Sequence, residues 1–252
     1  MKKKLTLGIW VIFLCLSTKA FALDCDTLKQ NFNQIKTQIT DASLWLQLST
    51  TTNDTALQKR ELTLKHKLSS QGEKIVIKIL SPADLQGIAI LTKIDAERNI
   101  AQWMYLPQTL QTKRILNTQK QTQFAGSEFT FEDLLPFDLS SYSCVGAVNE
   151  TPTTIKVLLK PEFSATSFTT LEAEFAKDSL QLLQIQYQNG NGEVTRIATF
   201  TDYRNITPTF KQPFHVTLNN LQRHRQSTLE ILKFDTDTVL QDAEFNLKAL
   251  SR

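Results

Sequence analysis

The chain has 252 residues, of which 41% are hydrophobic and 21% are charged, and its formal net charge at pH 7 is +3. Four lysines and no acidic residues lie in residues 1–22, so the rest of the chain holds 24 basic and 25 acidic residues. This nearly neutral remainder lacks the concentrated positive charge of a nucleic-acid-binding protein, and no nucleic-acid partner is expected.

The first 22 residues have the pattern of a cleavable export signal. Lysines at positions 2–4 precede an apolar run from Leu5 to Leu16, and Ala20-Phe21-Ala22 provides a small-x-small cleavage site. The run is shorter than the roughly 20 residues of a membrane span. Leu14 stands directly before Cys15, where a lipoprotein signal has a small residue, so lipid attachment at Cys15 is not expected. We expect a soluble exported protein that begins near residue 23.

Residues 23–252 contain two cysteines, Cys25 and Cys144. In an oxidising compartment they either form one disulfide, which ties the N-terminal segment to the middle of the chain, or remain two buried free thiols. No linker-like composition, charge block or internal repeat divides these residues, and the whole chain has only seven glycines and seven prolines. This argues for a single domain.

Hydrophobic spacing predicts one helix near the N-terminus and mainly strands after it. Leu28, Phe32, Ile35 and Ile39 recur at helical spacing within residues 24–39. Apolar positions then alternate with polar ones, and Asn189-Gly190-Asn191-Gly192 indicates a hairpin turn. The alternation predicts strands at 44–48, 62–68, 75–79, 88–94, 98–106, 155–160, 171–175, 182–188, 193–203, 214–218 and 228–234, with turns at 53–54, 70–72 and 81–84.

The predicted fold class is mainly β, with about ten or eleven strands in one antiparallel sheet and short helical or turn segments at 128–135 and 243–250. So wide a sheet does not stay flat, because strand twist accumulates. We therefore expect one curled antiparallel sheet that forms an incomplete β-barrel around short helices. Eight residues at inward positions are expected to line its interior, either as a lipid cavity or as closed core: Leu62, Leu64, Ile75, Ile77, Ile88, Ile90, Met104 and Leu106.

The sequence contains no recognisable catalytic or metal-binding motif. His66, His215 and His224 are isolated from one another and from the cysteines, which is not a metal-ligand spacing. No G-x-S-x-G nucleophile motif occurs, and Gly190-Asn191-Gly192 lacks the third glycine and lysine of a phosphate-binding loop. We expect no catalytic residues, no metal and no cofactor, and hence no enzyme. The 15 phenylalanines are either ordinary core or the lining of an acyl-chain site.

Several segments together resemble a known family. They are SPADLQGIAIL (81–91), WMYLP (103–107), KRI (113–115), FAGSEFTFEDL (124–134), the late strand segments 214–220 and 227–229, and an F-x-x-x-x-L ending at 245–250. In order and spacing they are similar to outer-membrane lipoprotein-sorting proteins of the LolA-like superfamily. The residues that carry this signature are Trp103, Tyr105, Pro107, Arg114, Gly126, Ser127, Phe129 and Asp133.

The resemblance implies a LolA-like incomplete barrel with an apolar cavity, in a periplasmic protein that binds or carries lipids or lipoprotein acyl chains. The implied role lies in outer-membrane lipoprotein sorting or lipid export, as a chaperone-like monomer. The resemblance also implies a membrane exporter of the resistance-nodulation-division type as a partner. The alternative function is therefore an accessory subunit of such an exporter that carries no lipid. No catalytic or ligand residue is carried over from the family.

Overall fold

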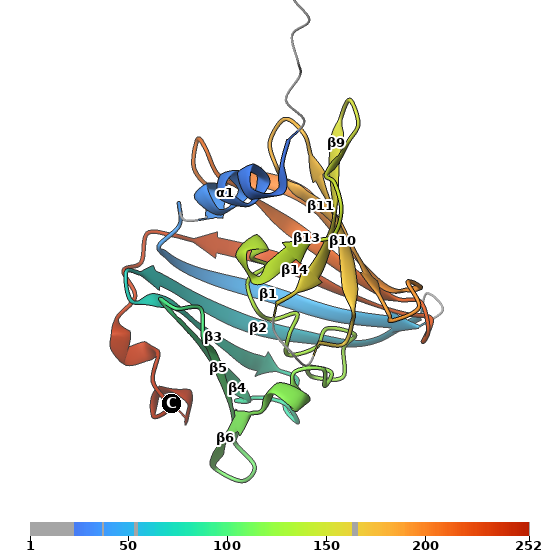
Figure 1. Cartoon of the computed structure of the whole chain (residues 1–252). Helices are drawn as coiled ribbons and strands as arrows, with labels where there is room; N and C mark the ends of the chain where they lie inside the picture. Colours follow the sequence, from blue (N-terminus) through green and yellow to red (C-terminus); the bar gives the residue numbers. More distant parts are fainter. Residues whose placement is uncertain (1–22, 37, 53–54, 163–165, 252) are drawn as a thin grey trace, which may run out of the picture.

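The computed structural model of the chain describes residues 23–36, 38–52, 55–162 and 166–251. The expected export signal (1–22) and the expected turn at 53–54 lie outside these residues. Within them, fourteen strands form one antiparallel sheet, and one α-helix, α1 (Cys25–Lys36), accompanies it (Figure 1). None of the described helices is long and apolar enough to cross a membrane.

The strands form two meanders. The first consists of β1 (Asp41–Thr52), β2 (Thr55–Ser69), β3 (Gly72–Ser81), β4 (Ala89–Asp95), β5 (Ile100–Leu106) and β6 (Gln111–Ile115). The second consists of β7 (Tyr142–Cys144), β8 (Asn149–Glu150), β9 (Thr154–Pro161), β10 (Thr170–Ala176), β11 (Leu182–Gln188), β12 (Val194–Asn205), β13 (Lys211–Asn220) and β14 (Arg225–Asp235). Four short 3-10 helices complete the described elements, at Asn117–Gln119, Leu139–Ser141, Asp242–Glu244 and Ala249–Ser251.

The two meanders join where the first strand pairs with the last. The order across the sheet is β6-β5-β4-β3-β2-β1-β14-β13-β12-β11-β10-β9-β7, and β8 pairs with β9. The sheet curls strongly, but its terminal strands β6 and β7 do not pair with each other (Figure 1). The sheet is thus an incomplete barrel, which we call the half-barrel, and the predicted fold class is confirmed.

Alternating side chains fill the concave face of the half-barrel. On β10, Leu171, Ala173 and Phe175 are fully buried and point inward, while the intervening Glu172 and Glu174 lie on the outer face beside Lys156. Full burial of a leucine or phenylalanine side chain contributes about 1.5–3 kcal/mol. The same alternation runs through β1, β2, β3 and β9, which is why the sequence pattern located these strands correctly.

The C-terminal residues 236–251 form a strap on the outer face of β3–β5 (Figure 1). Phe245 and Leu250 are each 1% exposed and belong to a second, smaller core with Leu91, Tyr105 and other outward side chains of β4 and β5. Ion pairs of Lys65 with Glu244 and of Lys74 with Asp242 (2.8 Å) fasten the strap. Val76, which the alternation places among outward lysines, is covered by this core.

Helix α1 lies across one end of the half-barrel (Figure 1). The Asp24 carboxylate caps its first turn by accepting a hydrogen bond from Thr27 N at 2.8 Å. Leu28 and Phe32 are buried on its inner side. The helix ends at Lys36 rather than at the predicted Ile39, and Ile39 is still buried because the chain there turns into β1.

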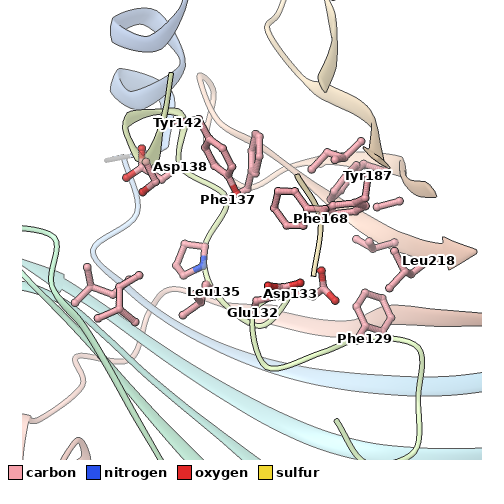
Figure 2. Close-up of a pocket in the computed structure, with 18 of the residues that line it drawn as sticks. Phe129, Glu132, Asp133, Leu135, Phe137, Asp138, Tyr142, Phe168, Tyr187 and Leu218 are labelled. Carbon is pink, nitrogen blue, oxygen red and sulfur yellow. The ribbon is translucent and has the colours of Figure 1, made fainter. Parts of the chain in front are cut away.

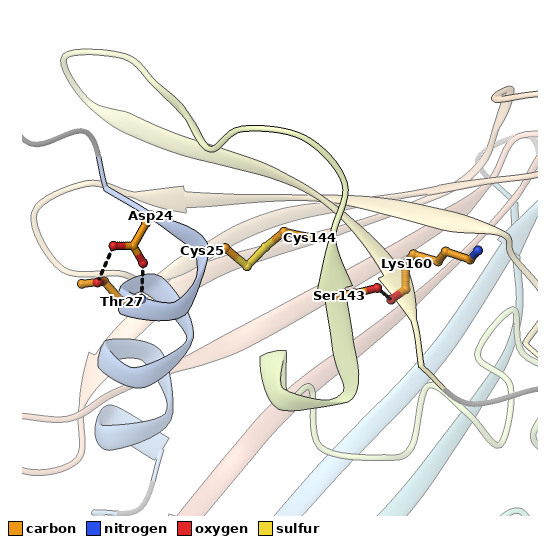
Figure 3. Close-up of a disulfide and its surroundings, with 6 residues drawn as sticks. All are labelled: Asp24, Cys25, Thr27, Ser143, Cys144 and Lys160. Carbon is orange, nitrogen blue, oxygen red and sulfur yellow. Dashed lines mark hydrogen bonds between the residues drawn. A yellow bond between two sulfur atoms is a disulfide. The ribbon is translucent and has the colours of Figure 1, made fainter.

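A disulfide between Cys25 and Cys144 joins the first turn of α1 to the edge strand β7 (Figure 3). The two Cα atoms are 6.3 Å apart, and 119 positions of sequence separate the cysteines. Of the two alternatives left open by the sequence, the structure therefore has the bridge. It holds the helix against the end of the half-barrel, where the cavity described below opens.

Candidate functional site

A cavity of about 530 Å³ opens at the end of the half-barrel that α1 crosses. Its walls come from α1, from the adjoining ends of β1, β2 and β3, and from the turns that connect β10 to β11 and β12 to β13. These segments lie far apart in the sequence. The antiparallel meander brings them together because every second turn of a meander falls at the same end of the sheet.

The walls of this cavity are mainly apolar. Leu44, Leu64 and Ile75 line it from the sheet, and Phe32 and Ile35 line it from α1. Four further phenylalanine rings contribute to the lining: Phe137, Phe200, Phe210 and Phe234. Such a surface offers dispersion contacts and release of water to an apolar ligand, but few hydrogen bonds.

Three polar side chains of this cavity, those of His66, Glu73 and Tyr203, already have hydrogen-bond partners. His66 Nε2 lies 2.7 Å from Glu73 Oε1 on the neighbouring strand. The Tyr203 hydroxyl donates a hydrogen bond to the carbonyl oxygen of Leu182, and burial raises the pKa of Tyr203 far above its usual value. The tyrosine therefore stays neutral, and the interior presents an apolar surface.

One wall of the cavity belongs to residues 116–141, which we call the crossing segment. It connects the two edge strands β6 and β7 and passes through the concave side of the half-barrel (Figure 1). Leu134, Leu135, Pro136 and Phe137 face the 530 Å³ cavity. The crossing segment thus determines how much of the interior is open and how much is filled.

The first half of the crossing segment is fixed by the buried Glu128. Its backbone N–H donates to Ser227 Oγ at 2.9 Å, and its carboxylate accepts from Asn220 Nδ2 at 2.8 Å. Arg225 Nη1 lies 3.2 Å from the same carboxylate, and Arg225 Nη2 donates to the Gly126 carbonyl at 3.2 Å. These partners all come from β13 and β14, so the contact fastens the middle of the chain to its last strands.

Gly126 is required by the local backbone at this point. Its φ is +68°, a conformation that other residues rarely adopt, and a Cβ there would lie 3.1 Å from Nη2 of the buried Arg60. Burial lowers the pKa of Arg60, and the charge of Arg225 acts in the same direction. The Gly-Ser turn of the family signature therefore lets the crossing segment pass beside a buried arginine.

The second half of the crossing segment is fixed by Arg196 of β12. Arg196 Nη1 donates to Asp133 Oδ2 at 2.7 Å, and Arg196 Nη2 lies 3.2 Å from Glu132 Oε1 and 2.9 Å from Ser167 Oγ. Thr130 adds hydrogen bonds to Asp133 from its backbone N–H (2.8 Å) and its hydroxyl (2.7 Å). The three charged side chains are almost fully buried, so we call Arg196, Glu132 and Asp133 the buried triad.

The surroundings of the buried triad shift its ionisation. Burial raises the pKa of Glu132, an effect that the hydrogen bond from Ser167 and the charge of Arg196 oppose. Burial also raises the pKa of Tyr187 well above its usual value, and the Arg196 guanidinium lies 4.5 Å from the centre of that ring. Glu132 is therefore more easily protonated than an exposed glutamate.

A second cavity of about 170 Å³ lies directly beside the buried triad (Figure 2). The Glu132 and Asp133 carboxylates point into it, with Phe168 and Tyr187 on the opposite side. An ion pair between Arg98 and Asp138 borders it. This cavity shares the wall formed by Leu135, Pro136, Phe137 and Phe200 with the 530 Å³ cavity.

The eight residues predicted to line the interior all point toward the concave side, but only two reach the larger cavity. Leu64 and Ile75 line it, whereas Leu62, Ile77 and Ile90 are closed core. Ile88 and Met104 are partly buried and pack against that core. Leu106 is half-buried and lines neither cavity.

The signature residues divide between three places. Trp103 and Tyr105 belong to the outer core under the C-terminal strap, and Pro107 packs beside Gly87. Arg114 is exposed on the edge strand β6. The other four belong to the crossing segment: Gly126, Ser127, Phe129 and Asp133. Arg196 was not predicted from the sequence. Its position on β12, two residues before the buried Ala198, indicates that its side chain points inward.

No group of three or more His, Cys, Asp or Glu side chains capable of holding a metal ion occurs in the described part of the chain. The two carboxylates of the triad are occupied by an arginine, a serine and a threonine.

Comparison with known proteins assigns the chain to a family. A family model with the description "Uncharacterized protein" matches residues 71–252, which is more than half of the chain. The chain belongs to this family. The match covers β3–β14, the crossing segment and the strap, and so includes both cavities' walls apart from α1, β1 and β2. No curated protein matches the sequence.

Solved structures show that this family has the LolA-like fold. An outer membrane lipoprotein-sorting protein domain from Vibrio parahaemolyticus is 20% identical, with a TM-score of 0.82 over 91% of this chain and 98% of that one. A DUF1329 family protein from Desulfovibrio piger is 19% identical, with a TM-score of 0.80 over 90% and 97%. A LolA superfamily protein from Nitrosomonas europaea is 14% identical, with a TM-score of 0.69 over 90% and 99%. The resemblance read from the sequence is thus confirmed for the fold.

Proposed function

We propose that this protein is a periplasmic carrier or binding protein for lipids or lipoprotein acyl groups, without enzymatic activity, that acts in outer-membrane lipoprotein sorting or lipid export. The observation that carries the proposal is the apolar cavity at the α1 end of the half-barrel. Its volume of about 530 Å³ lies within the roughly 300–1,000 Å³ of small-molecule sites. Its walls are mainly aliphatic and aromatic, and the side chains of His66, Glu73 and Tyr203 are engaged in hydrogen bonds.

An acyl chain needs nothing more specific than such a surface. Burial of one methylene gains about 0.8 kcal/mol, so about ten methylenes would gain about 8 kcal/mol before the cost of immobilising the chain. A net gain of about 8 kcal/mol would correspond to a dissociation constant near 1 μM, so the cost of immobilisation makes the acyl chain bind more weakly than this. Binding of this strength is reversible, as a carrier requires.

Three observations support the periplasmic assignment. The first 22 residues have the sequence pattern of an export signal. Cys25 and Cys144 are bridged, and disulfides persist mainly in oxidising compartments. A similar solved structure carries the description of an outer membrane lipoprotein-sorting protein. We place the boundary between signal and LolA-like domain at residue 22, with residues 23–252 as one domain that acts as a monomer.

The proposal is tested by gentle purification from the periplasm followed by mass spectrometry of an organic extract. We expect stoichiometric acylated molecules, and uptake of a fluorescent fatty acid by the delipidated protein. Leu64→Glu places a charge in the cavity wall and should abolish uptake. Thr63→Glu, at the neighbouring outward position of β2, is the matched control and should preserve it.

An empty extract together with no fatty-acid uptake would overturn the carrier proposal. That result would favour the alternative function, in which the protein is an accessory subunit of a membrane exporter of the resistance-nodulation-division type. Crosslinking in cells would then capture the periplasmic part of the exporter, with a lipid-free interior in the captured protein.

A further inference from the structure

The 170 Å³ cavity differs chemically from the larger one that it adjoins. Aromatic rings surround it, and carboxylates point into it (Figure 2). It is smaller than the roughly 300–1,000 Å³ of typical ligand sites, so it suits a head group better than a chain. We propose that this cavity is a binding site for an alkylammonium group.

The rings provide the first argument. Six aromatic side chains line the cavity: Phe129, Phe137, Tyr142, Phe168, Tyr187 and Phe200. Phe168 and Tyr187 meet edge to face with their centroids 5.0 Å apart, and Phe137 and Tyr142 meet at 5.7 Å. The faces of such rings attract cations, and several rings around one small space are the arrangement that binds quaternary ammonium groups.

The charges provide the second argument. Three carboxylates border the cavity, those of Glu132, Asp133 and Asp138, and two guanidinium groups pair with them, those of Arg196 and Arg98. These five groups carry one net negative charge when all are ionised, and the Lys120 ammonium, which does not line the cavity, also acts on Glu132. Among the described residues, no other cationic side chain forms an ion pair with these carboxylates. A bound cation would balance this charge, whereas a bound anion would face repulsion.

The position of the cavity indicates how an ammonium group would arrive. Leu135, Pro136 and Phe137 line both this cavity and the 530 Å³ cavity, so the two cavities adjoin at these residues. An amphiphile with an ammonium head could therefore place its head beside the buried triad and its acyl chain in the larger cavity. This extension to amphiphiles rests on the proposed carrier function, whereas binding of a small free ammonium ion does not.

The test uses tetramethylammonium and choline as probes, followed by calorimetry and by ligand-observed NMR at pH 8, because the raised pKa of Glu132 makes its ionisation more complete at higher pH. The control ligand is 3,3-dimethylbutan-1-ol, which has the shape of choline without the charge. We expect both cations to bind at least about tenfold more tightly than the neutral alcohol, because the ring faces and the carboxylates act only on a charge. Equal binding of choline and the alcohol, or no binding of either cation, would overturn the proposal.

Two variants locate the binding. Glu132→Gln removes one negative charge from the border of the cavity while keeping the shape, and Phe168→Leu removes one of the lining rings. Each should weaken choline binding by about tenfold. Glu172→Gln, an equal change of charge on the outer face of β10, should leave it unchanged. Near-ultraviolet circular dichroism reports whether each variant keeps the fold. If Glu132→Gln does not fold, Phe168→Leu still tests the same cavity. Unchanged choline affinity in a folded Glu132→Gln or Phe168→Leu variant would contradict the assignment.

A third arm separates the two sources of the ammonium group. Lysophosphatidylcholine below its micelle concentration carries both the head and an acyl chain. If it binds more tightly than choline, and loses that advantage in Leu64→Glu, the ligand is an amphiphile that spans both cavities. If choline binds but fatty acids and lysophosphatidylcholine do not, the carrier function fails while the ammonium site stands as a site for a free amine.

Discussion

Replacement of Arg196 by methionine is expected to destabilise the protein strongly, because it leaves two buried carboxylates without their cation. The side chains of Arg196, Glu132 and Asp133 are only 8%, 7% and 7% exposed, so water cannot replace the guanidinium. Removal of one partner from a buried ion pair costs about 3–5 kcal/mol. Arg196 also lies over the Tyr187 ring and contacts Ser167, so we expect a loss at the upper end of that range.

A triple variant shows whether this loss comes from the unpaired charges or from the changed packing. In Arg196→Met, Glu132→Gln and Asp133→Asn combined, none of the three positions carries a charge, and neutral or apolar replacements of buried ion pairs are often tolerated. We therefore expect the triple variant to recover most of the stability that Arg196→Met loses. The strong non-additivity follows from the shared contacts of the three residues.

The pH dependence gives a second check on the same residues. Burial raises the folded-state pKa of Glu132 above its ordinary value of 4.5. Between 4.5 and that raised pKa, the folded state binds more protons than the unfolded state, so the free energy of unfolding falls as pH rises. Arg196 opposes the raised pKa of Glu132, so its removal should steepen this fall.

Urea unfolding followed by tryptophan fluorescence at pH 5 and pH 8 measures all of these effects. A fall of less than about 1 kcal/mol in the free energy of unfolding of Arg196→Met, the scale of a solvent-exposed pair, would refute this prediction. A triple variant as unstable as the single one would also refute it, because the loss would then come from packing. Lys156→Met, on the outer face of β9 beside Glu172 and Glu174, is the matched control and should change little.

Two further predictions concern the disulfide and the outer core. Joint replacement of Cys25 and Cys144 by serine should lower the free energy of unfolding by about 5 kcal/mol, the chain-entropy value for a separation of 119 positions. The reduced wild-type protein should unfold in urea at the same midpoint as this double variant. A double variant with the midpoint of the oxidised wild type would contradict the prediction. Phe245→Ala should cost about 3–5 kcal/mol because Phe245 is fully buried under the strap. Fatty-acid uptake should survive this change, and its loss would show that the strap influences the cavity.

The sequence pattern located the long strands because their alternation has a direct physical cause. One face of each strand packs on the concave core and the other meets solvent, which produces a period of two. The short edge strands β6, β7 and β8 were not predicted. The exposed QTKRI of β6 carries polar and basic residues without alternation, and β7 and β8 are too short to show any period.

The site was predictable only in part, because its partners meet across the chain. Arg60 and Arg196 each occupy an inward position in a strand, where a charge needs a buried partner. That pattern predicts a buried ion pair but does not name the partner, since Glu132 lies 64 positions from Arg196. The signature residue Asp133 binds this arginine in the interior.

Alternation also does not distinguish an open cavity from a filled core. Leu62 and Leu64 have the same phase on β2, yet Leu62 is closed core and Leu64 lines the cavity. The difference depends on where the crossing segment and α1 lie within and across the half-barrel. Their positions are fixed by contacts with β12–β14 and by the disulfide, none of which appears as a local sequence pattern.

The pairing of the first strand with the last sets the order in which this protein can fold. At the buried Ser227 of β14, the hydroxyl contacts Thr50 of β1, 177 positions away, and accepts from the backbone of Glu128, 99 positions away. Contacts of such long range form late, because the chain between them must be ordered first. During synthesis the N-terminus emerges first, so β1 has one unpaired edge until β14 has emerged, and an unpaired edge is a template for aggregation. The nascent chain is therefore most vulnerable just before its final residues emerge.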